Sequence, residues 1–139
     1  MKRSQGFMTK AAILIALLLA APAEAQTACP AGQKPMLTVR LYFGMLQNGK
    51  LIADSAWEDF LAREVTPRFS DGYTVIPAMG RWRNPLTRVS GREPTRIVEV
   101  DAPDTKELHD NAEAIRKGYA ARFHQQSVGI VSLSTCGAF

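Results

Sequence analysis

The sequence predicts an α+β fold of the ferredoxin-like type, in which the element order βαββαβ places two helices on one face of an antiparallel sheet. Three observations predict it. Four short stretches are rich in β-branched and aromatic residues, as strands are. Two longer stretches carry apolar residues at helical spacing, one after the first predicted strand and one after the third. Cys29 precedes the first strand and Cys136 follows the last, and this fold brings those two ends together.

A secretory signal peptide is predicted over residues 1–25. A basic start with three positively charged side chains is followed by the uninterrupted apolar run 11–21. Ala23 and Ala25 then give the small-x-small pattern of a cleavage site. The apolar run is shorter than the roughly 20 residues that span a bilayer comfortably. An uncleaved anchor is the alternative interpretation.

Cleavage would leave residues 26–139 as a single domain, periplasmic or secreted, with no transmembrane segment. The removed part holds three basic residues and one acidic residue, so the formal net charge falls from +4 to +2. Nucleic-acid binding needs a concentrated basic footprint, so we expect no nucleic-acid partner. In an exported protein Cys29 and Cys136 are expected to form a disulfide, worth roughly 4–5 kcal/mol in the chain-entropy account. Two unpaired thiols are the alternative.

The first predicted strand covers residues 36–43, where apolar and polar side chains alternate. The first predicted helix follows it, and Ser55 with Glu58 has the spacing of a capping box. Pro67 ends this helix, because the residue before a proline is driven out of the α region. The apolar face of the helix contains Trp57, Phe60, Leu61 and Val65.

The second half predicts two more strands, a helix and a final strand. Residues 73–83 form a strand in which Pro77 indicates an edge position, since proline cannot donate to the ladder. Residues 95–101 form the third strand, and the second helix begins at Pro103 and Asp104. The buried stripe of that helix contains Leu108, Ala112, Ile115, Tyr119 and Phe123. Residues 127–133 form the last strand.

The last predicted strand is apolar on both faces. Val128 and Ile130 lie on one side, with Val131 and Leu133 on the other. Such a strand needs cover on both faces, and this fold leaves one face of the sheet without helices. A homodimer through that open face is therefore expected, although a lone hydrophobic edge would look the same.

The strongest candidate site is a group of arginines around Trp82. Its members are Arg81, Arg83, Arg88, Arg92 and Arg96, and the first two with Arg92 and Arg96 are the candidate binding residues. Guanidinium groups bind carboxylates and phosphates through paired hydrogen bonds, so the hairpin predicts a site for a small anionic ligand or an acidic envelope protein. The alternative is a solvated hairpin whose arginines pair with Glu93, Glu99 and their neighbours.

A second candidate pocket contains Arg40, Tyr42 and His124. These would be the polar groups of a cofactor-independent enzyme of the dimeric α/β-barrel type, with its pocket between sheet and helices. Fold analogy alone supports this alternative. The sequence predicts no cofactor and no metal, because no nucleophile motif or glycine-rich phosphate loop occurs. His109 and Glu113 have metal-compatible spacing but lack a third ligand nearby.

Several short motifs together carry a family resemblance. They are Leu41-Tyr42-Phe43-Gly44, Trp57, Phe60-Leu61, Val65-Thr66-Pro67-Arg68-Phe69, Gly80-Arg81-Trp82-Arg83, Arg92-Glu93, Ile115-Arg116, Tyr119, Arg122-Phe123, Gln125, Ser127-Val128 and Cys136. Through them the chain resembles the bacterial domain-of-unknown-function 3574 family over nearly all of residues 26–139. Thr95-Arg96 stands where a Ser-Lys pair is more usual, and Gly129 replaces a larger apolar residue. The resemblance implies a small exported α+β domain and brings no established activity.

The sequence therefore predicts a non-enzymatic binding module centred on Arg81, Arg83 and Arg92, with Trp82 as scaffold. The barrel-type enzyme is the alternative from another class. A purely structural envelope protein is the third.

Overall fold

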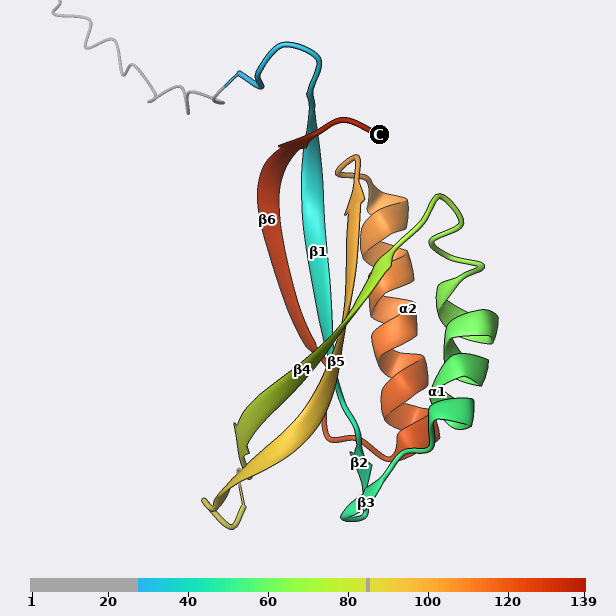
Figure 1. Cartoon of the computed structure of the whole chain (residues 1–139), viewed down its shortest axis with the longest axis vertical. Coiled ribbons are helices and arrows are strands. Elements are labelled where there is room, and N and C mark those ends of the chain that lie inside the picture. The colour runs from blue at the N-terminus through green and yellow to red at the C-terminus, as the bar shows by residue number, and fades with distance from the viewer. Residues whose placement is uncertain (1–27, 85) are drawn as a thin grey trace, which may run out of the picture.

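The computed structural model describes residues 28–84 and 86–139 (Figure 1). The predicted signal peptide, residues 1–25, lies outside the described residues. The elements in chain order are β1 (Lys34–Gly44), β2 (Leu46–Gln47), β3 (Lys50–Leu51), α1 (Asp54–Phe60), the π-helix η1 (Leu61–Val65), β4 (Thr74–Arg83), β5 (Ser90–Ala102), α2 (Lys106–Phe123) and β6 (Gly129–Gly137).

The main sheet has the strand order β4-β5-β1-β6, and every neighbouring pair is antiparallel. Both helices cover the same face of this sheet, and the other face is open (Figure 1). The predicted α+β class is confirmed, and the strand order is consistent with the ferredoxin-like pattern. Pro77 lies on β4, which is an edge strand as predicted.

The helix-covered face of the sheet carries the core. Alternate residues of β1 are buried there: Leu37, Val39, Leu41 and Phe43. The residues between them, from Thr38 to Tyr42, point to the open face. Two of those pair across to β5, where Thr38 bonds to Asp101 and Arg40 to Glu99.

Four aromatic rings fill the space between sheet and helices. Phe43, Trp57, Phe60 and Tyr119 are each fully buried. The ring centroids of Phe43 and Tyr119 lie 4.7 Å apart, and those of Phe60 and Tyr119 lie 5.1 Å apart, both edge to face. The apolar faces predicted for both helices are confirmed. Rings occupy the place where the barrel-type enzyme would need its pocket, which counts against that alternative.

The predicted helix starts need correction. The capping box at Ser55 is wrong, because Ala53 is the N-cap of α1 and no side chain caps this end. The second helix begins after Thr105, whose hydroxyl accepts from the backbone N–H of Leu108 at 3.2 Å. The first helical residue, Lys106, therefore lies two residues after Asp104. His124 ends α2 in the left-handed conformation, with φ 52°.

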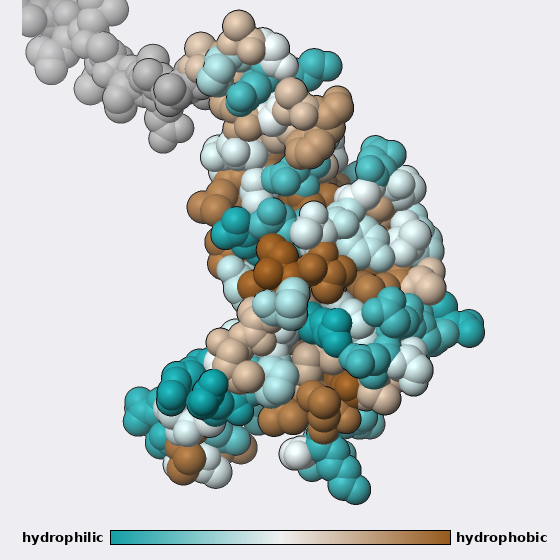
Figure 2. Space-filling view, in the orientation of Figure 1, coloured by the Kyte–Doolittle hydropathy of each residue, from teal (hydrophilic) through white to brown (hydrophobic). Residues whose placement is uncertain are grey.

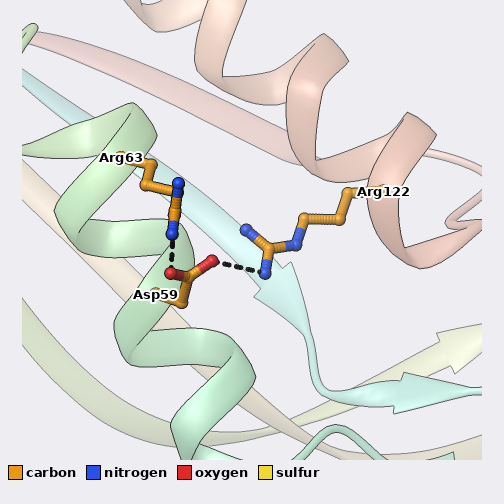
Figure 3. A network of polar contacts seen from close by, with 3 residues as sticks. All are labelled: Asp59, Arg63 and Arg122. Carbon is orange, nitrogen blue, oxygen red and sulfur yellow. Dashed lines mark hydrogen bonds and ion pairs between the residues drawn. The ribbon is translucent and has the colours of Figure 1, made fainter.

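Asp59 ties the two helices together (Figure 3). Its carboxylate accepts from Arg63 of η1 at 2.6 Å and from Arg122 of α2 at 2.8 Å. The hydrogen bond from Arg63, followed by that from Arg122, holds the pKa of Asp59 below its usual value. The carboxylate therefore stays ionised and bridges the helices at neutral pH.

Three strands extend beyond their predicted bounds, and β1 does so by two residues at its start and one at its end. β5 starts at Ser90 rather than at residue 95, and β6 runs on to Gly137. The β2-β3 hairpin was not predicted. Its turn residues Asn48 and Gly49 both have positive φ, at 51° and 76°. Asn-Gly is a strong signal for such a two-residue turn.

Cys29 and Cys136 form the predicted disulfide, with their Cα atoms 5.6 Å apart. Cys136 lies opposite Pro35 in the β1-β6 ladder, so the bond ties the last strand to the segment before the first. Within the part of the chain that the structure describes, no helix is long and apolar enough to cross a membrane.

Candidate functional site

The β4-β5 hairpin projects beyond the helices (Figure 1). Its turn is held by Asn84, whose side-chain oxygen accepts from the backbone N–H groups of Leu86 at 2.8 Å and Thr87 at 3.1 Å. The backbone N–H of Asn84 also donates to the carbonyl of Val89 at 2.9 Å. This end of the hairpin stands out from the body as a largely hydrophilic lobe (Figure 2). These hydrogen bonds of Asn84 hold the turn between the two strands.

Four arginines of this hairpin, Arg81, Arg83, Arg88 and Arg92, are exposed, and none has an ion pair within the described residues. Arg81 lies directly opposite Arg92 in the ladder, and Arg83 follows on the same face. Among residues 28–84 and 86–139, no carboxylate lies within 4.0 Å of their guanidinium nitrogens. Like charges directly opposite each other destabilise a sheet. No carboxylate of the described chain therefore neutralises these charges.

Arg96 does not belong to that group. Its guanidinium pairs with Asp54 at 2.5 Å and lies over the ring of Trp57, 5.7 Å from the centroid. It fixes the start of α1 against the sheet. The alternative pairing predicted for the hairpin is also not found, because Glu99 pairs with Arg40 and Glu93 accepts from the backbone N–H of Leu46.

A cavity of about 980 Å³, the hairpin cavity, lies between the end of the hairpin and two neighbouring segments. Its lining includes Tyr42, Gly44, Leu46, Asn48, Trp82, Arg83, Arg92, Glu93, Gln125 and Ser127. It thus brings Trp82, Arg83 and Arg92 of the arginine site together with Tyr42 of the second candidate pocket. Arg81, Arg96, Arg40 and His124 are not among the lining residues.

Two strand glycines make room for the aromatic side chains of this cavity. A Cβ at Gly80 would lie 2.7 Å from the indole nitrogen of Trp82 and 2.8 Å from the hydroxyl of Thr95. A Cβ at Gly129 would lie 3.3 Å from Cβ of Tyr42. Glycine weakens a strand interior, and often marks a close approach. The indole of Trp82 therefore lies back across its own strand because residue 80 has no side chain.

A third glycine, Gly44, makes room for a carboxylate. A Cβ there would lie 2.5 Å from a carboxylate oxygen of Glu93. That oxygen accepts from the backbone N–H of Leu46 at 3.0 Å, while Gln125 donates to the carbonyl of Leu46 at 2.7 Å. Side chains thus bind both the backbone N–H and the backbone carbonyl of Leu46. The side-chain nitrogen of Gln125 donates to backbone carbonyls, and its side-chain oxygen accepts no hydrogen bond within the described chain.

Tyr119 contacts the segment between Gly44 and Leu46 from inside the core. Its hydroxyl donates to the carbonyl of Gly44 at 2.7 Å and lies 3.6 Å from the sulfur of Met45. Burial raises the pKa of Tyr119 above its ordinary value of 10.0. The phenol therefore remains a hydrogen-bond donor, with a positioning role rather than that of a base.

The second predicted pocket, Arg40, Tyr42 and His124, is not assembled. The hydrogen bond with Glu99 raises the pKa of Arg40 and commits its guanidinium to β5. His124 is exposed at the end of α2. Only Tyr42 reaches a cavity, and it is the hairpin cavity.

Sequence reasoning missed Glu93 and Gln125 as site residues. The signals that could have found this corner are Gly80, inside the second predicted strand, and Gly44, directly after the first. Over the described ranges, no group of three or more His, Cys, Asp and Glu side chains could hold a metal ion. His109 instead pairs with Asp104 at 2.7 Å.

A second cavity, of about 680 Å³, lies at the opposite end of the sheet. It holds several carboxylates, but Glu99 and Asp101 are already bonded to Arg40 and Thr38. The hairpin cavity is the better candidate because, within the described chain, its arginines have no carboxylate partner, although Nε of Arg83 donates to the backbone carbonyl of Arg88 at 3.0 Å. Its lining also contains Tyr42 and Glu93.

Comparison with solved structures shows a shared fold with a phage enzyme. A phage SAM lyase in complex with S-methyl-5′-thioadenosine has a TM-score of 0.59 and 12% sequence identity, covering 82% of this chain and 95% of that chain. A phage SAM lyase in the apo state has a TM-score of 0.51 and 15% identity, covering 81% and 94%. At such identities the likeness shows the fold alone. No curated protein matches the sequence.

The family resemblance noted in the sequence is confirmed. The family model described as "Protein of unknown function (DUF3574)" matches residues 38–139, which include all of the helices and the whole hairpin cavity. The chain belongs to the DUF3574 family.

Proposed function

We propose that the protein is an exported binding module that holds a small anionic ligand in the hairpin cavity. The observation that carries this proposal is the state of Arg83 and Arg92. Both guanidinium groups line a cavity of about 980 Å³, and within the described chain neither has a carboxylate partner. Guanidinium groups bind carboxylate and phosphate oxygens through two parallel hydrogen bonds. An acidic group of the ligand would neutralise both.

The aromatic lining suits a planar group on the same ligand. Trp82 is 44% exposed, so part of the indole is accessible for stacking. Tyr42 lines the same cavity. Aromatic rings with a polar edge are favoured where a ligand must be held by both stacking and hydrogen bonding. The proposed ligand therefore combines a ring with an acid.

Export is part of the proposal. The predicted signal peptide and the Cys29–Cys136 disulfide both fit an oxidising compartment, since disulfides persist outside the cytoplasm. The site would then meet solutes of the periplasm or the medium. Native mass spectrometry of the protein purified from the periplasm of its host would report cleavage after Ala25 and any ligand retained.

The test compares AMP with adenosine, two probes that differ only in the phosphate. Fluorescence of Trp82 reports binding, because Trp57 is fully buried and gives a constant background. Wild type is expected to bind AMP more tightly than adenosine. The double variant Arg83→Gln, Arg92→Gln should lose that preference, about tenfold or more for two charge-assisted contacts.

Arg81→Gln is the matched control. Arg81 sits on the same strand, is exposed and does not line the hairpin cavity. Its substitution should leave the AMP preference and the melting temperature nearly unchanged. Equal binding of both probes by wild type, or an equal loss in Arg81→Gln, would show that the site is wrong.

Catalysis is the second candidate, favoured by the fold shared with a SAM lyase. A lyase bound to a purine thionucleoside shows that this fold accommodates a ring of the proposed kind in at least one protein. Incubation with SAM distinguishes the two functions. Release of S-methyl-5′-thioadenosine that is lost in the double variant would identify an enzyme. Binding without turnover supports the module.

A further inference from the structure

We propose that β6 is a dimerisation edge, and that its partner is β6 of a second copy of this chain. The outer side of β6 has no strand neighbour within the described sheet, so its outward backbone N–H and C=O groups are not paired in the ladder. Such a row of donors and acceptors is satisfied by another extended chain. The edge strand β6 has none of the features that usually prevent another strand from adding to a sheet.

Natural sheets protect their edges with charged residues, prolines, bulges or short strands. β6 runs for nine residues, Gly129–Gly137, and contains neither a charged residue nor a proline. Its apolar side chains Ile130, Val131 and Leu133 are 39%, 42% and 48% exposed. Hydrophobic side chains follow this edge on the left of the molecule in Figure 2. An unprotected edge of this length is typical of one that is covered.

The opposite edge of the same sheet is protected. β4 contains Pro77, which removes a backbone donor, and two arginines, Arg81 and Arg83. A β6 edge that added to the β4 edge of the next copy would continue without end and form a fibre. The sequence blocks that pairing at β4. Pairing of β6 with β6 closes after two copies.

A second copy also fits the chemistry of the edge. An antiparallel twin of β6 brings no charge against a strand that has none, and it supplies a complementary row of backbone groups. The exposed side chains lie on both faces of the sheet, with Ile130 on the helix side and Val131 and Leu133 on the open side. Pairing along the edge covers both sets at once. A dimer through the open face would leave Ile130 exposed.

The test uses three lysine variants, and sedimentation of the mature chain over a concentration series. Ile130→Lys and Leu133→Lys place a charge on the two faces of β6. Ile76→Lys places one at a similarly exposed position, 37%, on the open face of β4. Wild type and Ile76→Lys are expected to sediment as dimers. Each β6 variant should raise the dissociation constant about a hundredfold, because symmetry introduces every lysine twice.

Hydrogen exchange provides a second measurement. Amides of β6 should exchange slowly in the wild-type dimer and faster in the β6 variants, while β4 amides stay unchanged. A wild type that is monomeric at every concentration would overturn the proposal. So would a dimer broken by Ile76→Lys but not by Ile130→Lys, which would place the interface on the open face.

Discussion

At the scale of single residues, the site depends on what is missing as much as on what is present. Gly80 lacks the side chain that would displace the indole of Trp82, and Gly44 lacks one that would displace the carboxylate of Glu93. The arginines that reach the hairpin cavity lack the acidic partners that Arg40 and Arg96 have. The candidate site thus combines the space above two glycines with arginines that have no carboxylate partner within the described chain.

Gly80→Ala is expected to damage this arrangement. The new Cβ would meet the Trp82 nitrogen at 2.7 Å and the Thr95 hydroxyl at 2.8 Å, and Thr95 is buried. Overpacking of this kind costs about 1–3 kcal/mol, and the indole must turn away from the strand. Urea unfolding should show the loss of stability, and the emission of Trp82 should shift. AMP binding should weaken.

Gly91→Ala is the control, since nothing lies within 4 Å of a Cβ at that position. Its free energy of unfolding should stay the same or rise by less than about 1 kcal/mol, because alanine restricts the unfolded chain. If both variants behave alike, the cost at Gly80 is a backbone effect, and the space for Trp82 is not the reason for that glycine.

At residue scale the sequence predicted the kinds of side chain but not their partners. It singled out the arginines, yet Arg96 proved to be paired with Asp54, which lies 42 positions away in sequence. The alternative interpretation paired Glu93 with an arginine, but its carboxylate accepts from the backbone N–H of Leu46. Such choices depend on the path of the backbone after Gly44, and local sequence does not encode that path.

At the scale of elements, hydrophobic periodicity predicted both helices and their buried faces. It predicted the ends less well, because an end is decided by a few polar atoms. Ser55 and Glu58 have the spacing of a capping box, but the N-cap of α1 lies two residues earlier, at Ala53. Asp54 is then free to pair with Arg96 of β5. A tertiary ion pair has replaced a local cap.

Two substitutions separate the real cap from the apparent one. Thr105→Ala should destabilise the protein by about 1 kcal/mol, since it removes the acceptor for the Leu108 N–H at the start of α2. Ser55→Ala should leave the free energy of unfolding nearly unchanged, because no side chain caps α1. Urea unfolding of both variants measures this. An equal loss in the two would mean that Ser55 caps α1 in solution.

At the scale of the whole molecule, the strand order places the start of β1 and the end of β6 at one end of the sheet and the turn of the β4-β5 hairpin at the other (Figure 1). The sequence predicted this meeting of the ends from the two cysteines and the βαββαβ order. It could not predict how far the hairpin would project, because β5 extends five residues beyond the stretch with strand periodicity. That extension contains Arg92 and Glu93, two residues of the candidate site.

The disulfide therefore serves stability at a distance from the site, which gives a last prediction. The bond joins residues 107 positions apart, and a loop of that length is worth about 4–5 kcal/mol in the chain-entropy account. A small domain is stable by about 5–15 kcal/mol, so the double variant Cys29→Ala, Cys136→Ala should be folded but far less stable. Urea unfolding should show the loss.

AMP binding should survive in that variant at a temperature where it is folded, because the hairpin cavity borders the end of β1 and the disulfide lies beside its start. Reduced wild type is the matched control and should behave like the double variant. A loss of less than about 1 kcal/mol would mean that the denatured chain is already compact enough for the bond to add little. A loss of binding with the fold intact would mean that strain at the chain ends reaches the hairpin through β1.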